Sequence, residues 1–441
     1  MKILFISLGC DKNLADSEEM LGLLTGSGHE IVDSEEEAEA IVINTCCFIH
    51  DAKEESVNTI LEMAEYKKTG KCKALVVTGC MAQRYKEEIT QEIPEVDAVL
   101  GTTSYGDIVK ALNEVQAGHV FQEFRDINEL PEDSGRRVLT TGGHFGYLKI
   151  AEGCDKHCTY CIIPSLRGSF RSVPEERLLA QAEYMASQGV KELILVAQET
   201  TVYGTDLYGR KTLHILLKKL CQIRGIRWIR VLYCYPEEIY DELIQVMKEE
   251  KKICNYLDLP IQHASDRILK RMGRRTTRKQ LTDIITKLRR EIPDIVLRTS
   301  LITGFPGETQ EDHEELMEFV DEMEFDRLGV FTYSPEEGTP AETMEGQVPE
   351  EVKEERRDEI MSLQQEISLE KGSERIGQEL LVMIEGKVAD EDAYVGRSQA
   401  DAPGVDGYVF VNTPETLVSG DFVRVKITGA LEYDLIGEIS Q

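Results

Sequence analysis

The chain has 441 residues, of which 41% are hydrophobic and 30% are charged, and its formal net charge at pH 7 is −31. This length predicts two to four domains, and no apolar run approaches the about 20 residues that a membrane span requires. The acidic charge disfavours phosphate backbones and favours basic protein partners, although a charge that only maintains solubility agrees equally well with the composition. We therefore expect a soluble, cytoplasmic protein that does not bind membranes.

The 11 cysteines predict metal or redox chemistry. We recognise no export signal, and a reducing compartment would keep these thiols free. An odd number of cysteines also argues against a framework of disulfides.

Residues 1–125 alternate short apolar runs with amphipathic stretches, which predicts an open parallel α/β domain. Three of the apolar runs end in cysteine: ILFISLGC at Cys10, AIVINTC at Cys46 and ALVVTGC at Cys80. A single cysteine in such a place is more often a packing residue, but parallel strands bring their carboxyl ends to one edge of a sheet. We expect the three thiols to gather there, and we prefer Cys46 to its neighbour Cys47 because Cys46 closes its strand as the other two do.

Residues 126–143 lack apolar periodicity and predict a linker. Residues 144–371 return to alternating strands and helices, and their six βα units predict a partial TIM-like barrel with its active site at the strand carboxyl ends. Residues 372–441 contain five short strands separated by glycines, which predicts an OB-like five-stranded β-barrel.

The stretch EGCDKHCTYCIIPSLRG carries three closely spaced cysteines, Cys154, Cys158 and Cys161. A structural zinc site would need a fourth ligand, and the only nearby candidate, His157, adjoins Cys158 in an awkward position. An iron–sulfur cluster held by three thiolates leaves one iron open to a small molecule. An assay of iron content would separate these alternatives.

This C-x3-C-x2-C loop after a barrel strand resembles that of the radical S-adenosylmethionine (SAM) superfamily. The resemblance implies a 4Fe-4S cluster on Cys154, Cys158 and Cys161 that cleaves SAM to a 5′-deoxyadenosyl radical. The segment SLITGFPGE is similar to the family's adenine-binding segment, apart from a serine in place of its first glycine, and implies SAM contacts at Ile302 and Gly304.

Gln198 and Glu199 follow the predicted strand ELILVA, at the place where the superfamily binds the amino group of SAM. The resemblance therefore implies that they bind the cofactor. A polar pair after a strand is also typical of a turn or a helix cap, which is the alternative interpretation.

The whole chain resembles the radical SAM methylthiotransferases, with an N-terminal methylthiotransferase domain, a radical SAM barrel and a C-terminal TRAM barrel. This implies a second 4Fe-4S cluster on Cys10, Cys46 and Cys80. It also implies the insertion of sulfur and a methyl group into a C–H bond, with one SAM as methyl donor and another as the source of the radical.

Four stretches, SLGCDKNLADSE, INTCCFIHDAKEES, YLKIAEGCDKHCTYCIIPSLRG and GVFTYSPEEGTPA, resemble the branch that modifies the β-carbon of an aspartate in the small-subunit ribosomal protein uS12. The expected partners are this basic protein, or the ribosomal subunit that carries it, and an electron donor such as flavodoxin or ferredoxin. Residues 373–441 contain 5 Lys and Arg against 13 Asp and Glu, a net charge of −8, which makes a tRNA partner unlikely. The alternatives are a tRNA adenosine methylthiotransferase and a non-catalytic iron–sulfur factor associated with the ribosome.

Overall fold

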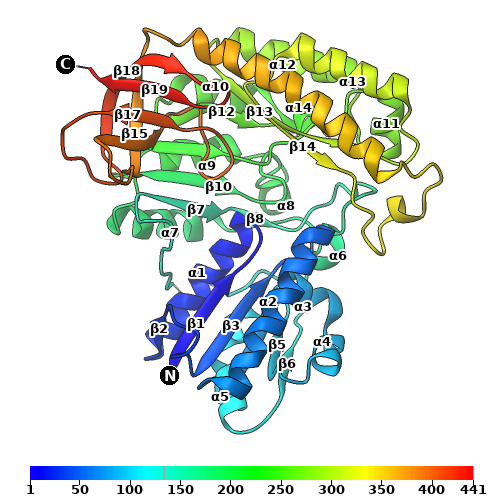
Figure 1. Cartoon of the computed structure of the whole chain (residues 1–441), viewed down its shortest axis with the longest axis vertical. Coiled ribbons are helices and arrows are strands. Elements are labelled where there is room, and N and C mark those ends of the chain that lie inside the picture. Colours follow the sequence, from blue (N-terminus) through cyan, green and yellow to red (C-terminus); the bar gives the residue numbers. More distant parts are fainter. Residues whose placement is uncertain (133–134, 441) are drawn as a thin grey trace.

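The computed structural model of the chain describes residues 1–132 and 135–440. Two six-stranded parallel sheets and a closed five-stranded barrel organise these residues (Figure 1). Residues 133 and 134 of the predicted linker and residue 441 of the predicted C-terminal domain lie outside the described part. No helix within the described part is long and apolar enough to cross a membrane.

The N-terminal sheet has the strand order β2-β1-β3-β4-β5-β6. Its strands are β1 (Lys2–Ser7), β2 (Glu30–Val32), β3 (Ala40–Thr45), β4 (Ala74–Gly79), β5 (Ala98–Leu100) and β6 (Phe121–Glu123). β3 and β4 are buried along their whole length, as continuous apolar strands are when helices cover both faces of a parallel sheet. The predicted open parallel α/β architecture is confirmed.

Helices cover the two faces of this sheet. α1 (Asp11–Gly26) and α5 (Ile108–Gln116) share one apolar cluster with the sheet. α2 (His50–Thr69), α3 (Cys80–Tyr85) and α4 (Glu87–Glu92) share another cluster with the opposite face. A short 3-10 helix, η1 (Tyr105–Asp107), precedes α5.

The second sheet has the order β14-β13-β12-β11-β10-β7 and is the predicted partial barrel. Its strands are β7 (Phe145–Lys149), β10 (Glu192–Val196), β11 (Trp228–Val231), β12 (Ile253–Asp258), β13 (Val296–Thr303) and β14 (Arg327–Thr332). Two short strands, β8 (Ala151–Glu152) and β9 (Arg171–Ser172), pair beside it. Figure 1 shows this curved sheet above the N-terminal α/β unit.

The helices of the partial barrel are α6 (Ile163–Arg167), α7 (Glu175–Ser187), α8 (Thr205–Tyr208), α9 (Leu213–Leu220), η2 (Pro236–Glu238), α10 (Asp241–Glu249), α11 (Asp266–Arg271), α12 (Arg278–Glu291), α13 (Gln310–Met323), η3 (Pro340–Thr343) and α14 (Glu350–Ser373). α13 begins with a capping box, in which the Thr309 side chain accepts from the backbone of Asp312 and Asp312 accepts in return from Thr309. Because this cap satisfies free backbone N–H groups, it fixes where the preceding GFPGE loop ends.

The C-terminal residues form a closed barrel with the order β15-β16-β17-β19-β18. The strands are β15 (Glu379–Lys387), β16 (Ala393–Arg397), β17 (Val409–Asn412), β18 (Phe422–Ala430) and β19 (Leu435–Ile439). The predicted five-stranded barrel is therefore confirmed. It packs against the partial barrel, where Glu192 of β10 forms buried ion pairs with Arg230 and with Arg397 of β16, at 2.8 and 2.7 Å.

Candidate functional site

The N-terminal sheet brings Cys10, Cys46 and Cys80 to one edge. β1, β3 and β4 are neighbours, and the register pairs Thr45 with Gly79, so that Cys46 and Cys80 follow paired residues. Gly9 has a φ of +85°, and a Cβ at Gly9 would lie 2.6 Å from the Cβ of Cys46. Only glycine permits this approach, which holds the loop of Cys10 against Cys46.

Cys46 and Cys80 are buried, whereas Cys10 is exposed. Burial raises the pKa of Cys46 to about 12, with further contributions from the Cys80 and Cys10 sulfurs. Burial also raises the pKa of Cys80, although the Arg167 guanidinium opposes this effect. Thiols bind iron as thiolates, and three cysteine sulfurs at one sheet edge form a donor set that suits iron–sulfur ligation.

The second cysteine set lies in the loop that follows β8. Cys154 and Cys158 are buried and Cys161 is half-buried. Their loop is fixed by backbone hydrogen bonds, from Cys154 N to Gly168 O at 3.1 Å and from Cys161 N to Cys158 O at 3.0 Å. Burial, with a contribution from Cys158, raises the pKa of Cys154 to about 11 and that of Cys161 to about 12.

His157, the only zinc ligand that the sequence offered near this loop, is exposed. It has a φ of +52°. Within residues 1–132 and 135–440, no three metal-ligating side chains lie close enough to hold one metal ion. The thiolates of an iron–sulfur cluster bind different irons, and three cysteines in one loop suit such a cluster.

Gln198 and Glu199 follow the end of β10 after one residue, Ala197, as predicted. The Glu199 side chain is 1% exposed, and its Oε1 accepts a hydrogen bond of 2.9 Å from the Thr201 backbone. Burial raises the Glu199 pKa to about 7. Gln198 Oε1 and Glu199 Oε2 are buried and have no hydrogen-bond partner in the described part of the chain. Such acceptors suit a donor that a ligand would bring.

Ile302 and Gly304 lie at the end of β13. The Ile302 backbone N–H donates to Gln262 O at 2.8 Å. Gly304 has a φ of +70°, and a Cβ there would lie 2.1 Å from Lys353 Cγ on α14. Glu308 closes the loop, since it accepts from Phe305 N at 3.1 Å and pairs with Arg356 at 2.9 Å.

The sequence did not identify the side chains that connect the two α/β units near the cysteines. Arg167, at the end of α6, lies 3.6 Å from the Cys80 sulfur. Lys12, two residues after Cys10, lies over the ring of Tyr233 beyond β11. Neither contact has a signal in the sequence, because each depends on how the two α/β units pack.

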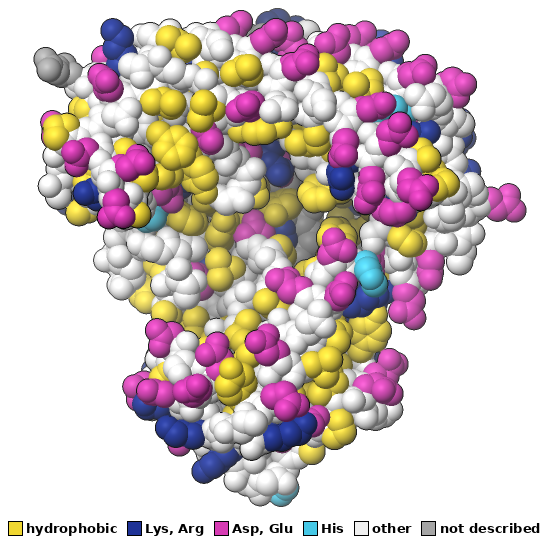
Figure 2. Space-filling model, in the orientation of Figure 1, with side chains coloured by type: hydrophobic (Ala, Val, Ile, Leu, Met, Phe, Trp, Pro, Cys, Tyr) yellow, Lys and Arg dark blue, Asp and Glu magenta, His cyan; other side chains and the backbone are white. Residues whose placement is uncertain are grey.

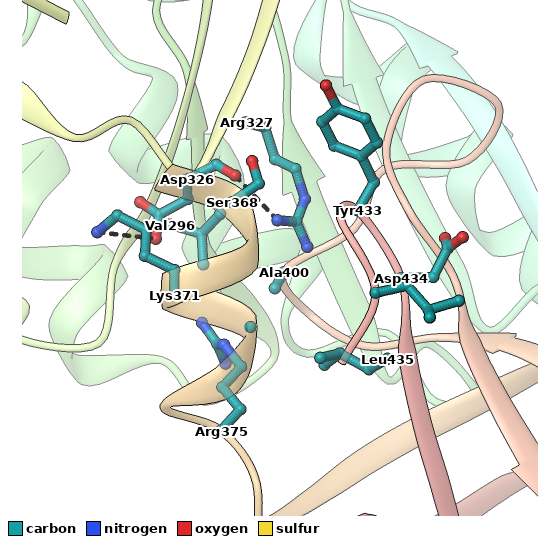
Figure 3. A pocket seen from close by; sticks show the side chains of 12 residues that line it. Val296, Asp326, Arg327, Ser368, Lys371, Arg375, Ala400, Tyr433, Asp434 and Leu435 are labelled. Atoms are coloured by element: carbon teal, nitrogen blue, oxygen red, sulfur yellow. Dashed lines mark hydrogen bonds and ion pairs between the residues drawn. The ribbon is translucent and has the colours of Figure 1, made fainter. Parts of the chain in front are cut away.

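Figure 2 shows a hollow in the surface between the N-terminal unit and the partial barrel, where hydrophobic and charged side chains are visible. A separate small pocket lies between α14 and the C-terminal barrel (Figure 3), and Arg327, Lys371 and Tyr433 are among its lining residues. That pocket contains no cysteine, and we do not assign it to the site.

Comparisons with known proteins agree with this organisation. Residues 2–101 match the Uncharacterized protein family UPF0004, residues 148–320 match the Radical SAM superfamily, and residues 376–439 match the TRAM domain. A protein of Lachnoclostridium phytofermentans named ribosomal protein uS12 methylthiotransferase RimO is 63% identical to this chain. The match covers 99% of this chain and 99% of the length of that protein. A protein of the same name from Clostridium botulinum is 50% identical over 100% of this chain and 98% of its own.

The chain belongs to the RimO family of radical SAM methylthiotransferases. The predicted branch, which is the RimO type, and the predicted class of enzyme are thus confirmed. Membership also supports SAM and an iron–sulfur cluster as cofactors. Among solved structures, the radical SAM methyltransferase TsrM from Kitasatospora setae has a TM-score of 0.55 at 13% identity and covers 77% of this chain and 76% of its own. This likeness concerns the fold alone.

Proposed function

We propose that this RimO-family enzyme methylthiolates the β-carbon of an aspartate in ribosomal protein uS12, the protein for which its relatives are named. The observation that carries the proposal is the presence of two three-cysteine sets, one at the carboxyl end of the N-terminal parallel sheet and one in the loop after β8. Arg167, at the end of α6, reaches from beside this loop to the Cys80 sulfur of the other set. Each set is the site of one 4Fe-4S cluster in this proposal.

Cys154, Cys158 and Cys161 hold the first cluster, which supplies the electron that cleaves SAM when it is bound. The unpartnered oxygens of Gln198 and Glu199 accept the amino group of SAM, and Ile302 and Gly304 lie against its adenine. Cys10, Cys46 and Cys80 would hold the second cluster, which would carry the sulfur that is inserted.

Charge supports a protein substrate. Residues 373–441 carry a net charge of −8, which attracts a basic ribosomal protein and repels tRNA phosphates. We propose that uS12, free or in the small ribosomal subunit, is the partner and that tRNA is not. We also propose a small electron-transfer protein, such as flavodoxin or ferredoxin, as reductant, and a cytoplasmic location, which suits 11 free cysteines.

We further propose the four segments expected from the sequence as the organisation of the chain: an N-terminal methylthiotransferase domain of residues 1–125, a linker of 126–143, a radical SAM domain of 144–371 and a TRAM domain of 372–441. The three family matches fall within the three domains. Limited proteolysis that cuts first within residues 126–143 or near residue 372 would support these boundaries.

The test is a paired turnover assay with anaerobically reconstituted enzyme. Unmodified uS12 and unmodified tRNA are offered separately, and each product is weighed by mass spectrometry. A methylthio mass increase on the uS12 aspartate alone is the expected result, whereas an increase on tRNA alone would contradict the substrate assignment.

Replacement of the cysteines tests whether the two cysteine sets have the different roles proposed for them. Replacing Cys154, Cys158 or Cys161 by alanine is expected to abolish SAM cleavage. Replacing Cys10, Cys46 or Cys80 is expected to leave SAM cleavage and to abolish sulfur insertion. SAM cleavage that survives the first set, or methylthiolation that survives the second, would show that the roles are wrongly divided.

A further inference from the structure

Arg167 occupies a buried position between the two cysteine sets. It ends α6, the short helix that starts two residues after Cys161, and its side chain is 3% exposed. Its backbone thus lies in the helix that follows the loop of Cys154, Cys158 and Cys161, while its guanidinium extends to the end of β4, where Cys80 lies.

The guanidinium has two edges with different partners. Its Nη1 contacts carboxylates, with Asp16 Oδ2 at 2.8 Å and Glu152 Oε1 at 3.3 Å. Its Nη2 donates to Asn13 Oδ1 at 2.6 Å and lies 3.6 Å from the Cys80 sulfur. The planar fork of arginine can hold these directions together, which the single ammonium of lysine cannot do.

The charges around Arg167 balance without the sulfur. Lys149 pairs with both Asp16 and Glu152, so two cations face two carboxylates within this buried group. These ion pairs do not require the Nη2 edge to lie near a thiol. The Asn13 amide also holds the loop of Cys10, because its Nδ2 donates to Leu8 O at 3.2 Å and to Thr45 O at 2.9 Å.

We propose that Arg167 is a positioning residue of the second cluster site, which donates a hydrogen bond to the Cys80 sulfur and raises the reduction potential of a cluster bound there. The proposal rests on the proposed function, which places a cluster on Cys10, Cys46 and Cys80. Reduction adds negative charge to a cluster, and a cationic donor beside one of its sulfurs stabilises that charge. Arg167 would in this way connect the segment that follows Cys161 to the reduction potential of the second cluster.

The test isolates the second cluster in the full-length chain, with Cys154, Cys158 and Cys161 all replaced by alanine. In this background Arg167→Lys keeps the positive charge and removes the planar guanidinium group. Arg171→Gln is the matched control, since Arg171 lies four residues further along the chain, in β9, and its guanidinium donates to the carbonyls of Ser169 and Arg167. The readouts are the midpoint potential from an EPR-monitored redox titration and the coupling of an exchangeable proton to the cluster measured by ENDOR.

Arg167→Lys is expected to retain the iron, to shift the midpoint potential to a more negative value and to lose the proton coupling, while Arg171→Gln changes neither readout. If the single variant does not fold, the charge-balanced pair Arg167→Gln with Glu152→Gln replaces it, with the same expectation. An unchanged potential with the coupling retained would overturn this inference alone. If the chain with native Arg167 holds no cluster in this background, the proposed function falls together with the inference.

Discussion

The ammonium of Lys12 lies 3.3 Å from the centre of the Tyr233 ring. Lys12 follows the Cys10 loop, and Tyr233 follows β11 of the partial barrel, so this contact joins the two α/β units beside the candidate site. Burial works to lower the pKa of Lys12, but Asp11 and Tyr233 outweigh it and hold the pKa above its ordinary value. Lys12 therefore stays charged inside the interface.

Two substitutions of Tyr233 should lower the free energy of unfolding by different amounts. Tyr233→Phe keeps the ring and loses the hydrogen bond of 3.1 Å from the Tyr233 hydroxyl to Asp11, so we expect the free energy of unfolding to fall by about 1 kcal/mol. Tyr233→Leu also loses the cation–π contact, which is worth about 2 kcal/mol when desolvated. Urea denaturation measures both, with Tyr208→Leu, at a position 48% exposed, as the control. Equal losses for Phe and Leu would contradict a role for the ring.

Cys46 and Cys47 should differ in their effect on iron content. Cys47 is fully buried in an apolar cluster of the N-terminal unit, whereas Gly9 holds the Cys10 loop against Cys46. In the chain that lacks Cys154, Cys158 and Cys161, we expect Cys46→Ala to lose bound iron and Cys47→Ala to retain it. Iron and sulfide analysis after anaerobic reconstitution decides between them, and the opposite pattern would make Cys47 the ligand.

The Glu199 carboxyl should make stability depend on pH in the metal-free chain. Burial raises its pKa to about 7, against about 4.3 in an unfolded chain. Between these pH values the folded state binds more protons than the unfolded state, so the free energy of unfolding falls as the pH rises. The total loss approaches about 3–4 kcal/mol above pH 7, at about 1.4 kcal/mol per pKa unit.

We expect Glu199→Gln to remove this component when denaturation is compared at pH 5 and pH 8. Glu176→Gln, at an exposed position, serves as the control and should follow the unmodified chain. A pH dependence that is the same with and without Glu199 would show that the carboxyl is not responsible.

The described part of the linker is fixed to α1 by a buried ion pair. Arg137 Nη2 lies 2.6 Å from Glu18 Oε2 and also donates to Tyr147 O at 2.7 Å. Arg137→Met leaves the Glu18 carboxylate buried and uncompensated, and we expect a loss of about 3–5 kcal/mol. Adding Glu18→Gln should recover part of this loss, because glutamine is neutral and still accepts from Thr140 N, which lies 2.7 Å from Glu18 Oε1. Denaturation of both variants measures the difference, and a further loss in the double variant would argue against the ion pair.

Gly304 should tolerate no side chain. Gly304→Ala requires a positive φ from alanine and brings a Cβ within 2.1 Å of Lys353 Cγ, so we expect weaker SAM binding and a loss of stability of about 1–3 kcal/mol. Gly338 also has a positive φ, of +79°, but faces open space. Gly338→Ala therefore reports the backbone strain alone and should leave SAM affinity unchanged in equilibrium dialysis. Equal SAM affinities for the two variants would show that Gly304 does not belong to the SAM site.

The amino-acid sequence by itself determined the elements and the candidate ligands. Apolar runs that end at Cys10, Cys46 and Cys80 predicted strand ends at one sheet edge, and the spacing of Cys154, Cys158 and Cys161 predicted a loop that can hold a cluster. These signals are local, because periodicity and ligand spacing depend on residues close in the chain. The same holds for the five short strands that close the C-terminal barrel.

Only the tertiary structure decided how these parts meet. The contact between Arg167 and Cys80 spans 87 residues, and that between Tyr233 and Asp11 spans 222. Sequence periodicity does not predict such pairs, because an arginine or a lysine in an amphipathic stretch is usually expected to be exposed to solvent. Its burial is known only when the packing of the other unit is known. These residues are buried and paired because the two α/β units pack against each other. This packing places side chains of one unit beside the cysteines of the other unit.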